Sequence, residues 1–285
     1  MSRIPPGSTA ATVRASNILD AIHGDEIRTP FRQSSYQQNS SYNNLDIRRS
    51  GRRTVDLERA LASLRRGEFV LVYDGDGREA ETDLTIASEF VTPAGIRTLR
   101  KEAGGLICMT VSGEVQARIG LPFMTDVLRR AGPAYPVLEA VSAEDFKYDR
   151  HSAFSIAVNH RDTFTGVTDM DRAKTIARLA GIAKEAVKRE NGWAAHAFAE
   201  EFRSPGHVPL LNAAEQLFEE RRGHTELTTA LMIMAGLAPT ATICEMMSDD
   251  GRALSKEDAK AYARERNLVF LEGQDIVRAW RLWSV

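Results

Sequence analysis

Residues 69–83 read FVLVYDGDGREAETD, and this stretch decides how the chain folds. Its first five residues form a short apolar run that is typical of a buried strand. The strand must end where the acids begin, because charged side chains are costly to bury unless they are paired or bound to a metal. The stretch therefore predicts a core strand that ends in an acidic loop.

The segments on both sides of this strand alternate between helical and extended patterns. Before it, Leu57, Leu61 and Leu64 recur at helical spacing, and Gly67 ends that helix. Elsewhere the patterns predict strands at 106–112, 153–160, 240–247 and 268–271, and helices at 92–104, 169–179, 224–237, 255–266 and the C-terminus. Interleaved strands and helices favour one α/β (α+β) domain with a mixed β-sheet flanked by helices. Residues 130–150 show no clear period and are expected to form an irregular insertion.

The N-terminal region differs from the rest of the chain. Residues 34–44 read SSYQQNSSYNN, and residues 1–53 hold eight arginines, no lysine and four acids. A segment this polar cannot bury enough apolar surface to fold by itself. We therefore expect a disordered, mildly basic extension at 1–53 and a folded domain at 54–285. An organelle presequence is the alternative reading, because such segments are also rich in Arg and Ser.

The composition argues against several classes of partner. The 285 residues include 37 basic and 39 acidic side chains, a net charge of −2, so neither nucleic acid nor an anionic membrane is expected as a partner. No apolar run approaches the roughly 20 residues of a membrane span. The two cysteines, Cys108 and Cys244, belong to no zinc pattern, and they favour a reducing compartment, the cytoplasm.

Three acids stand at alternate positions of the loop, Glu79, Glu81 and Asp83. If the segment is extended, their side chains point to one face, where carboxylates repel one another unless a cation or a proton joins them. Magnesium prefers oxygen ligands and uses one or two protein carboxylates, so one acid could hold a metal while the others move protons. The alternative is a solvated acidic loop after a strand.

A second charged motif, RRGHTE at 221–226, stands at the expected start of a helix. Free backbone N–H groups at a helix start attract phosphate, and Arg221 and Thr225 would reinforce them. His224 can present a neutral ring nitrogen to a metal ion. The alternative is an ordinary junction between a loop and a helix, with Thr225 as its cap.

Three further residues suit either a site or the structural core. His207 follows a Pro-Gly turn in RSPGHV at 203–208, and histidines in loops are often merely exposed. Cys108 lies in the apolar strand LICMTV, which favours a buried structural cysteine. Glu245 interrupts the apolar strand TICEMM, and an acid in that position needs a partner or a function.

Seven segments, taken in order, resemble the signatures of the 3,4-dihydroxy-2-butanone 4-phosphate synthase family. They are REAETDL (78–84), GGLICM (104–109), FTGVTDMDRAKTI (164–176), FRSPGHVPLL (202–211), RRGHTELTTALMIMAGL (221–237), ICEMMSDDGRALSKEDAKAYA (243–263) and LVFLEGQDIV (268–277). Each motif alone is weak, whereas their order and combination are specific and span residues 54–280. Residues 152–166 and RSPGHVPLL are most similar to the archaeal branch of that family.

The resemblance implies a lyase of riboflavin biosynthesis that converts D-ribulose 5-phosphate to L-3,4-dihydroxy-2-butanone 4-phosphate and formate, using a pair of Mg²⁺ or Mn²⁺ ions in each site. It also implies a homodimer with active sites at the subunit interface. Carried over motif by motif, it assigns the metal ligands to Glu79 and His224. It assigns catalysis to Glu81, Asp83, Cys108, His207 and Glu245, and substrate binding to Arg78, Asp83, Thr165, Asp171, Arg172, Thr175, Arg221 and Thr225.

The chain departs from the Asp-Arg-Glu-Asn-Glu-Gly-Asp loop of bacterial members. Gly77 precedes Arg78, and Ala80 and Thr82 replace the Asn and the Gly, while the three acids remain. Two cysteines do not supply the zinc site of the GTP cyclohydrolase II domain to which many members are fused, so a single activity is expected. Two other readings are another sugar-phosphate isomerase or aldolase, which would release no formate, and an inactive scaffold, which would lack a site acid or histidine.

Overall fold

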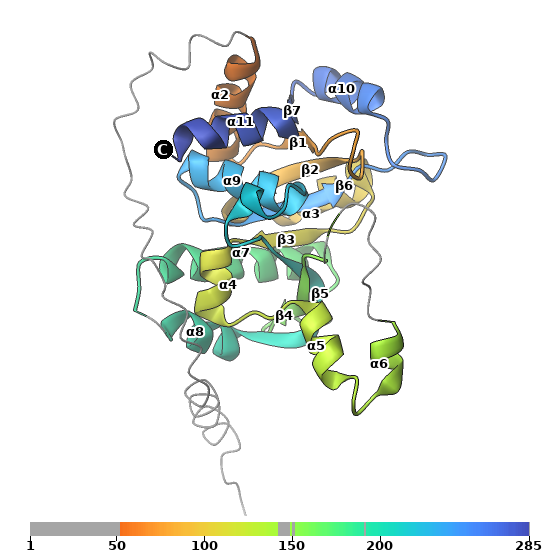
Figure 1. Ribbon diagram of the computed structural model, residues 1–285. Helices are drawn as coiled ribbons and strands as arrows, with labels where there is room; N and C mark the ends of the chain where they lie inside the picture. Colours follow the sequence, from red (N-terminus) through yellow and green to blue (C-terminus); the bar gives the residue numbers. More distant parts are fainter. Residues whose placement is uncertain (1–51, 142–148, 150–151, 191, 285) are drawn as a thin grey trace, which may run out of the picture. The chain divides into compact units, whose positions relative to one another are not determined.

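The computed structural model describes residues 52–141, 149, 152–190 and 192–284. At its centre is a seven-stranded sheet in the order β4-β5-β3-β6-β2-β1-β7 (Figure 1). β1 runs parallel to β7 and β3 runs parallel to β5, whereas the other neighbouring strands are antiparallel. The strands are β1 Val70–Tyr73, β2 Thr82–Ala87, β3 Cys108–Val111, β4 Phe154–His160, β5 Phe202–Asn212, β6 Ala241–Glu245 and β7 Val269–Glu272. The predicted mixed sheet is confirmed.

Helices cover both faces of this sheet and enclose two apolar cores. Along β1, Val70 and Val72 belong to one core and Leu71 to the other, as the two-residue period of a strand requires. The first, here called the α9 core, contains residues of α2 Arg52–Arg65, α9 His224–Ala235 and α11 Gly273–Trp283. The second, the α7 core, contains residues of α3 Pro93–Thr98, the π-helical turn Leu99–Ala103, α4 Gly113–Ile119, α7 Asp169–Ala186, α8 Trp193–Glu201 and α10 Lys256–Glu265.

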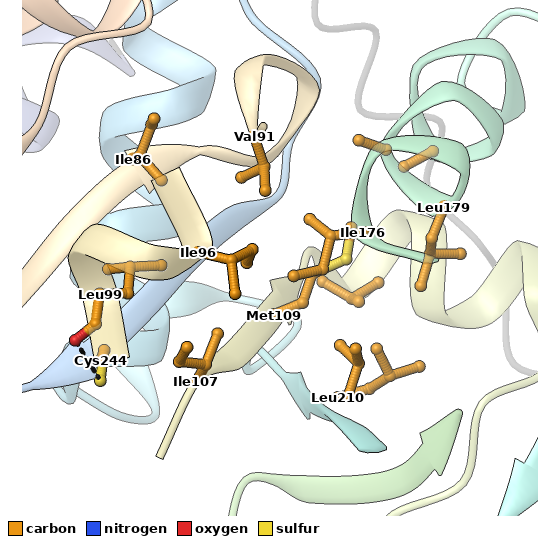
Figure 2. Close-up of a cluster of buried hydrophobic side chains, with 14 of the residues drawn as sticks. Ile86, Val91, Ile96, Leu99, Ile107, Met109, Ile176, Leu179, Leu210 and Cys244 are labelled. Atoms are coloured by element: carbon orange, nitrogen blue, oxygen red, sulfur yellow. Dashed lines mark hydrogen bonds between the residues drawn. The ribbon is translucent and has the colours of Figure 1, made fainter. Parts of the chain in front are cut away.

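Close packing of aliphatic side chains fills the α7 core. Figure 2 shows Ile96, Met109 and Ile176, from two helices and the inner strand β3, pointing toward one another. All three are completely buried, so truncating one of them to Ala would cost about 2 to 5 kcal/mol of stability. The two cysteines lie in different cores, with Cys108 in the α9 core and Cys244 in the α7 core, and both are free thiols.

Side-chain caps start the helices where the sequence predicts them. The Thr92 hydroxyl accepts the N–H of Gly95 at 3.1 Å, and Ser255 accepts that of Asp258 at 3.1 Å. α9 is buried around almost its whole circumference, because it packs against α2, α11 and the sheet. A helix that is apolar all round must be enclosed in this way. The start of this helix brings the RRGHTE motif to the loop between β1 and β2.

The structure corrects several predicted elements. RSPGHV lies within the long strand β5: Arg203 and Val208 pair with β4, and the residues between them leave the ladder. Two short helices, α5 Met124–Ala131 and α6 Pro136–Ala140, overlap the segment expected to be irregular. α7 continues to Ala186, and α4, α8 and β2 were not predicted. The extension expected at 1–53 lies outside the described residues, apart from its last two, which start α2. None of the helices described is long and apolar enough to cross a membrane.

Candidate active site

One carboxylate, Asp74, organises the loop between β1 and β2. Its Oδ1 accepts the backbone N–H groups of Gly75 and Glu81 at 2.8 and 3.1 Å. Its Oδ2 accepts the N–H of Glu79 at 3.0 Å and a guanidinium N–H of Arg78 at 3.1 Å. The Asp74 side chain is fully buried, and a buried carboxylate needs all of these donors. Asp74 therefore fixes where the other acids of the loop lie.

Ala80 shows why the acids do not follow a simple alternation. Its φ is 57°, so the backbone turns between Glu79 and Glu81, and β2 begins only at Thr82. The premise that one extended segment carries Glu79, Glu81 and Asp83 on one face is therefore wrong for the first half of the segment. A left-handed backbone suits Asn better than Ala, so the departure at Ala80 adds local strain.

His224, the first residue of α9, joins the acidic loop to the helix. Its Nδ1 lies 3.2 Å from Oε2 of Glu79, and its Nε2 lies 3.2 Å from the main-chain oxygen of Glu81 and 3.8 Å from Oδ1 of Asp83. Ligand atoms of Asp74, Glu79 and His224 all lie within 4.8 Å of one another. The two residues predicted to bind metal, Glu79 and His224, therefore meet, and Asp74 joins them.

Burial and charge give these neighbouring acids different proton affinities. Burial acts to raise the pKa of Glu79, but the hydrogen bond with His224 and the charge of Arg78 outweigh it and lower this pKa to about 2. For Asp83, burial dominates and raises the pKa to about 7. The pKa of Glu81 is also raised, first by burial and then by the charge of Glu79. The loop thus holds an ionised carboxylate beside two acids whose pKa values are raised, and that of Asp83 lies near neutral pH.

The donor atoms of this cluster fit a hard divalent cation. Carboxylate oxygens are the ligands that Mg²⁺ prefers, and a neutral imidazole can join them. Oδ1 of Asp83 is buried and has no hydrogen-bond partner among the described residues; such an acceptor is costly to leave unsatisfied. That oxygen lies 3.8 Å from Nε2 of His224, whereas Glu79 approaches Nδ1 of the same ring. Both oxygens of Asp74 are already used by the loop backbone, so the geometry favours Glu79 and His224 as ligands.

An arginine pair lies beside the cluster and packs against Gly223. A Cβ at Gly223 would lie 2.6 Å from Nη1 of Arg221 and 2.7 Å from Nη2 of Arg78, so glycine leaves the space that both guanidinium groups need. Arg221 donates to Oε2 of Glu226 at 2.8 Å and, through Nε, to Oδ2 of Asp149 at 2.9 Å. Asp149 also pairs with Arg78. Two adjacent guanidinium groups provide the charge and the planar donors that a phosphate group requires.

Glu226 fixes the start of α9. It is completely buried, its Oε2 accepts the N–H of Gly223 at 3.0 Å, and its Oε1 accepts the N–H of Ala214 at 3.1 Å. Gly223 is therefore the residue that caps the helix, and the alternative reading with Thr225 as the cap is wrong. Thr225 is the second helical residue and is buried beside His224.

Cys108 and Glu245 border the acids from neighbouring strands. Asp83 and Glu245 are paired in the register of β2 and β6. Oε2 of Glu245 accepts the N–H of Leu106 at 2.7 Å, which supplies the partner that the sequence required. Cys108 is buried as predicted, and burial, followed by the charge of Glu245, raises the pKa of its thiol well above the ordinary range. Cys108 is thus a protonated neighbour of the cluster and not a thiolate nucleophile.

A second group of predicted site residues surrounds Asn159 on β4. Nδ2 of Asn159 lies 3.1 Å from Nδ1 of His207 and donates to the main-chain oxygen of Thr165 at 3.4 Å. Oδ2 of Asp171 accepts the N–H of Gly166 at 2.9 Å and the hydroxyl of Thr165 at 3.4 Å. The structure therefore joins His207, Thr165 and Asp171 in one hydrogen-bonded network.

Thr175 and Arg172 hold this second group in place. The Thr175 hydroxyl is fully buried, donates to the main-chain oxygen of Asp171 at 2.9 Å and accepts the N–H of His160 at 3.0 Å. The hydroxyl of Thr175, for which a substrate contact is predicted, thus makes two backbone hydrogen bonds in this structure. Arg172 pairs with Asp169 at 3.4 Å, and its buried Nε has no hydrogen-bond partner within the described part of the chain.

The two groups lie on different parts of the sheet. The metal cluster is built on β1, β2 and the start of α9, whereas His207 and Asn159 are on β5 and β4. In the strand order, β3 and β6 separate β5 from β2, which is about 14 Å at the usual spacing of about 4.8 Å. A single chain therefore does not bring Thr165, Asp171 and His207 next to Glu79 and His224.

Sequence reasoning gave no role to four residues that shape these groups, Asp74, Asp149, Asn159 and Glu226. A signal existed for Glu226, because an acid three residues after a helix cap often binds back to it. Asn159 was detectable as a polar residue that breaks the buried strand pattern. Asp74 and Asp149 both contact Arg78. Nothing in the sequence around Asp149 indicates this contact, because Arg78 is 71 residues away.

Comparisons with known proteins agree with this geometry. A family model described as 3,4-dihydroxy-2-butanone 4-phosphate synthase matches residues 58–279. The synthase of Methanothermobacter thermautotrophicus is 50% identical over 227 residues, which is 79% of this chain and 96% of that protein. The synthase of Methanosarcina mazei is 48% identical over 232 residues, with 80% and 92% covered.

Solved structures show the same fold. A 3,4-dihydroxy-2-butanone 4-phosphate synthase in complex with two magnesium ions matches with a TM-score of 0.61 at 28% identity, over 78% of this chain and 95% of that one. The synthase of Candida albicans matches with a TM-score of 0.60 at 27% identity, over 78% and 96%.

Proposed function

Because the chain belongs to the 3,4-dihydroxy-2-butanone 4-phosphate synthase family, we propose that it converts D-ribulose 5-phosphate to L-3,4-dihydroxy-2-butanone 4-phosphate and formate. The observation that carries the proposal is the meeting of Glu79, His224 and the arginine pair in one buried cluster. The reaction removes a proton beside a carbonyl, loses a hydroxyl, rearranges the carbon skeleton and expels formate. Such steps need several acids and bases around polarised C–O oxygens.

We infer that the site uses Mg²⁺ or Mn²⁺, two ions as in the magnesium complex of the related synthase, with Glu79 and His224 as protein ligands. When bound, these ions polarise the oxygens of the substrate. Arg78 and Arg221 hold the phosphate through charge-assisted bonds. Asp83 and Glu81 move protons, a role supported by their raised pKa values.

Glu245 and Cys108 support these acids from the neighbouring strands β6 and β3. Glu245 stays tied to the N–H of Leu106, which keeps its carboxylate beside Asp83. Cys108 contributes a neutral, buried side chain next to these acids. The backbone of Thr225, in the first turn of α9, completes the phosphate site from the helix end.

We further infer a homodimer in which the partner subunit supplies the second group to each site. The inference is supported by the distance along the sheet between this group and the metal cluster, and by the apolar surface next to Thr165. Phe164, Val167 and Met170 are 95, 51 and 67% exposed within seven residues of chain. Apolar side chains gathered on a surface in this way mark a contact with another molecule.

Formate release tests the proposed reaction. The purified protein is incubated with ribulose 5-phosphate and Mg²⁺, and formate is measured with and without excess chelator. We expect formate only in the presence of free metal. An isomerase or aldolase would consume the sugar phosphate without releasing formate, and that result would replace the proposal.

Mixing two inactive variants tests the shared site. His224→Gln removes a residue of the metal cluster, and His207→Gln removes one of the second group. If each site combines residues of two subunits, mixed dimers hold one intact site, and an equal mixture recovers about a quarter of the parental rate. If each site belongs to one chain, every site in the mixture carries a lesion and no activity returns.

We place the protein in the cytoplasm. The support is that Cys108 and Cys244 are free, buried and located on opposite faces of the sheet. Thiols kept apart in this way suit a reducing compartment. The boundary between the extension at 1–53 and the catalytic domain at 54–285 remains a proposal.

A further inference from the structure

Asn159 lies where the pairing of β4 and β5 is interrupted. Val158 is opposite Val208, but the next residue, Asn159, is opposite Arg203, so the strand pair shifts register at this point. Asn159 is 4% exposed, and its side chain bonds to the part of β5 that has left the ladder. A buried amide at a β-bulge is placed to hold whatever the bulge displays, and this bulge displays His207.

The backbone of His207 determines how the Asn159 amide is oriented. The N–H of His207 can only donate, and the Asn159 atom that it meets at 2.8 Å must therefore be the oxygen Oδ1. The nitrogen Nδ2 then faces the ring of His207, with Nδ1 at 3.1 Å. Because Nδ2 is a donor, Nδ1 of the ring must be the acceptor. In a neutral imidazole, the proton then resides on Nε2.

Hydrogen bonds and close packing together fix the orientation of the amide. The other N–H of Nδ2 is directed at the main-chain oxygen of Thr165, 3.4 Å away. A Cβ at Gly166 would lie 2.0 Å from Nδ2, and a Cβ at Gly206 would lie 2.0 Å from the carbonyl carbon of Val158. The two glycines thus let the chain close over Asn159 from both sides. A flipped amide would place its NH₂ against the N–H of His207 and lose both bonds.

We propose that Asn159 is a positioning residue that selects the tautomer of His207, with the lone pair on Nδ1 and the proton on Nε2. The exposed edge of the ring then presents an N–H to its surroundings and not a lone pair. This proposal rests on the proposed function in one respect, namely that His207 contacts the substrate. There His207 would donate a hydrogen bond to a substrate hydroxyl or carbonyl oxygen and would not accept a proton.

Nitrogen NMR of the metal-free protein, whatever its oligomeric state, tests the proposal without any turnover. Long-range ¹H–¹⁵N spectra distinguish a protonated ring nitrogen from one with a free lone pair, and His207→Gln identifies the signals of His207. We expect Nε2–H in the parent at neutral pH. A parent spectrum with the proton on Nδ1, or with equal populations of both forms, would overturn the proposal.

Asn159→Asp provides the complementary measurement. The carboxylate has the same shape but no donor, so the ring of His207 should turn to Nδ1–H or become charged. The matched control is Asn212→Asp, which should leave the His207 signals unchanged. Asn212 is also a buried amide, it lies on β5, and it donates to the main-chain oxygen of Pro122 at 3.1 Å. An unchanged ring in folded Asn159→Asp would also overturn the proposal. If the protein released no formate, these spectra would still report the tautomer of His207. The proposal is therefore tested separately from the proposed function.

Discussion

Glu79 and Asp83 approach the same imidazole, yet their surroundings give them opposite proton affinities. Glu79 lies within reach of two arginines, whereas Asp83 is enclosed by the sheet and faces Glu245. One loop therefore supplies a permanent anion and a proton carrier. Asp74 makes this division possible, because it fixes the backbone of the loop before any ligand binds.

The metal role of Glu79 can be tested with an isosteric change. Glu79→Gln keeps the shape of the side chain and removes its charge, so we expect the dissociation constant for Mn²⁺ to rise by about tenfold to a hundredfold. Calorimetric titration of parent and variant measures this change. Glu68→Gln, at an exposed acid paired with Arg66, is the matched control. Equal affinity in the parent and in Glu79→Gln would remove Glu79 from the ligand set.

The arginine pair predicts a defect in substrate binding. Arg221→Ala removes charge-assisted bonds to phosphate, each about 1.5 to 3 kcal/mol, so the Michaelis constant should rise by about tenfold to a hundredfold. The neighbouring exposed Arg222, changed to Ala, is the control. Formate kinetics are compared with thermal melting, because Arg221 also pairs with the buried Glu226. A Michaelis constant that stays at the parental value would show that the phosphate is bound elsewhere.

Glu201 makes a contribution to stability that depends on pH. The hydrogen bonds from Arg178 lower its pKa in the folded state. A lowered pKa gives stability that is complete above the unfolded value of about 4.3 and is lost as the pH falls through the folded value. Glu201→Gln should therefore cost less than about 1 kcal/mol at pH 7, since the pair is partly exposed, and progressively less below pH 4. Urea unfolding across this range, with Glu265→Gln as control, would refute the idea if the cost stayed constant.

The individual residues of the site were predictable where a motif carries its own chemistry. Glu79 and His224 were paired as ligands from the resemblance alone, and the structure brings their side chains together. The motif predicts a substrate contact for Thr175 but does not reveal that its hydroxyl is bonded twice to the backbone. Asp149 carried no signal, because its partners are distant in sequence.

At the scale of elements, apolar runs were sufficient to predict strands and polar strands were missed. β1, β3, β6 and β7 are short and apolar, and each was predicted within a few residues. β5 was missed because its first half, which is mostly exposed, carries Ser, Pro, Gly and His beside a bulge. That half is irregular for a reason that no local pattern contains, namely the contact of Gly206 with β4.

Substitutions at two glycines distinguish the effect of close packing on stability from the effect of backbone freedom. A Cβ at Gly206 would lie 2.0 Å from the backbone of β4, so Gly206→Ala must shift one strand and should cost about 1 to 3 kcal/mol. Gly181, within α7, has no atom within 4 Å of the added Cβ, so Gly181→Ala should instead stabilise the protein by about 0.5 to 1 kcal/mol. Urea unfolding of the two variants gives the comparison. A neutral Gly206→Ala would contradict the close approach of the strands.

At the scale of the whole molecule, the described domain contains every residue assigned to the two groups, and α2 begins it at Arg52. Deleting residues 1–51 should therefore leave formate release and oligomeric mass unchanged, because that segment supplies no assigned residue. Light scattering and formate assays of the truncated and full chains provide the measurement. A truncated protein without activity would place part of the active unit before α2.

The strand order also has a consequence for the time at which the protein can fold. β1 pairs with β7, and β2 pairs with β6, so the first hairpin to leave the ribosome meets its outer neighbours only when residues 241–272 have been made. At about 5 to 20 residues per second, that wait is roughly 10 to 40 s. During it, the nascent hairpin exposes two apolar faces and two open edges, the features that invite aggregation. Chaperones and proteases should therefore encounter this chain mainly during its synthesis, with the acids of the active site made early and assembled last.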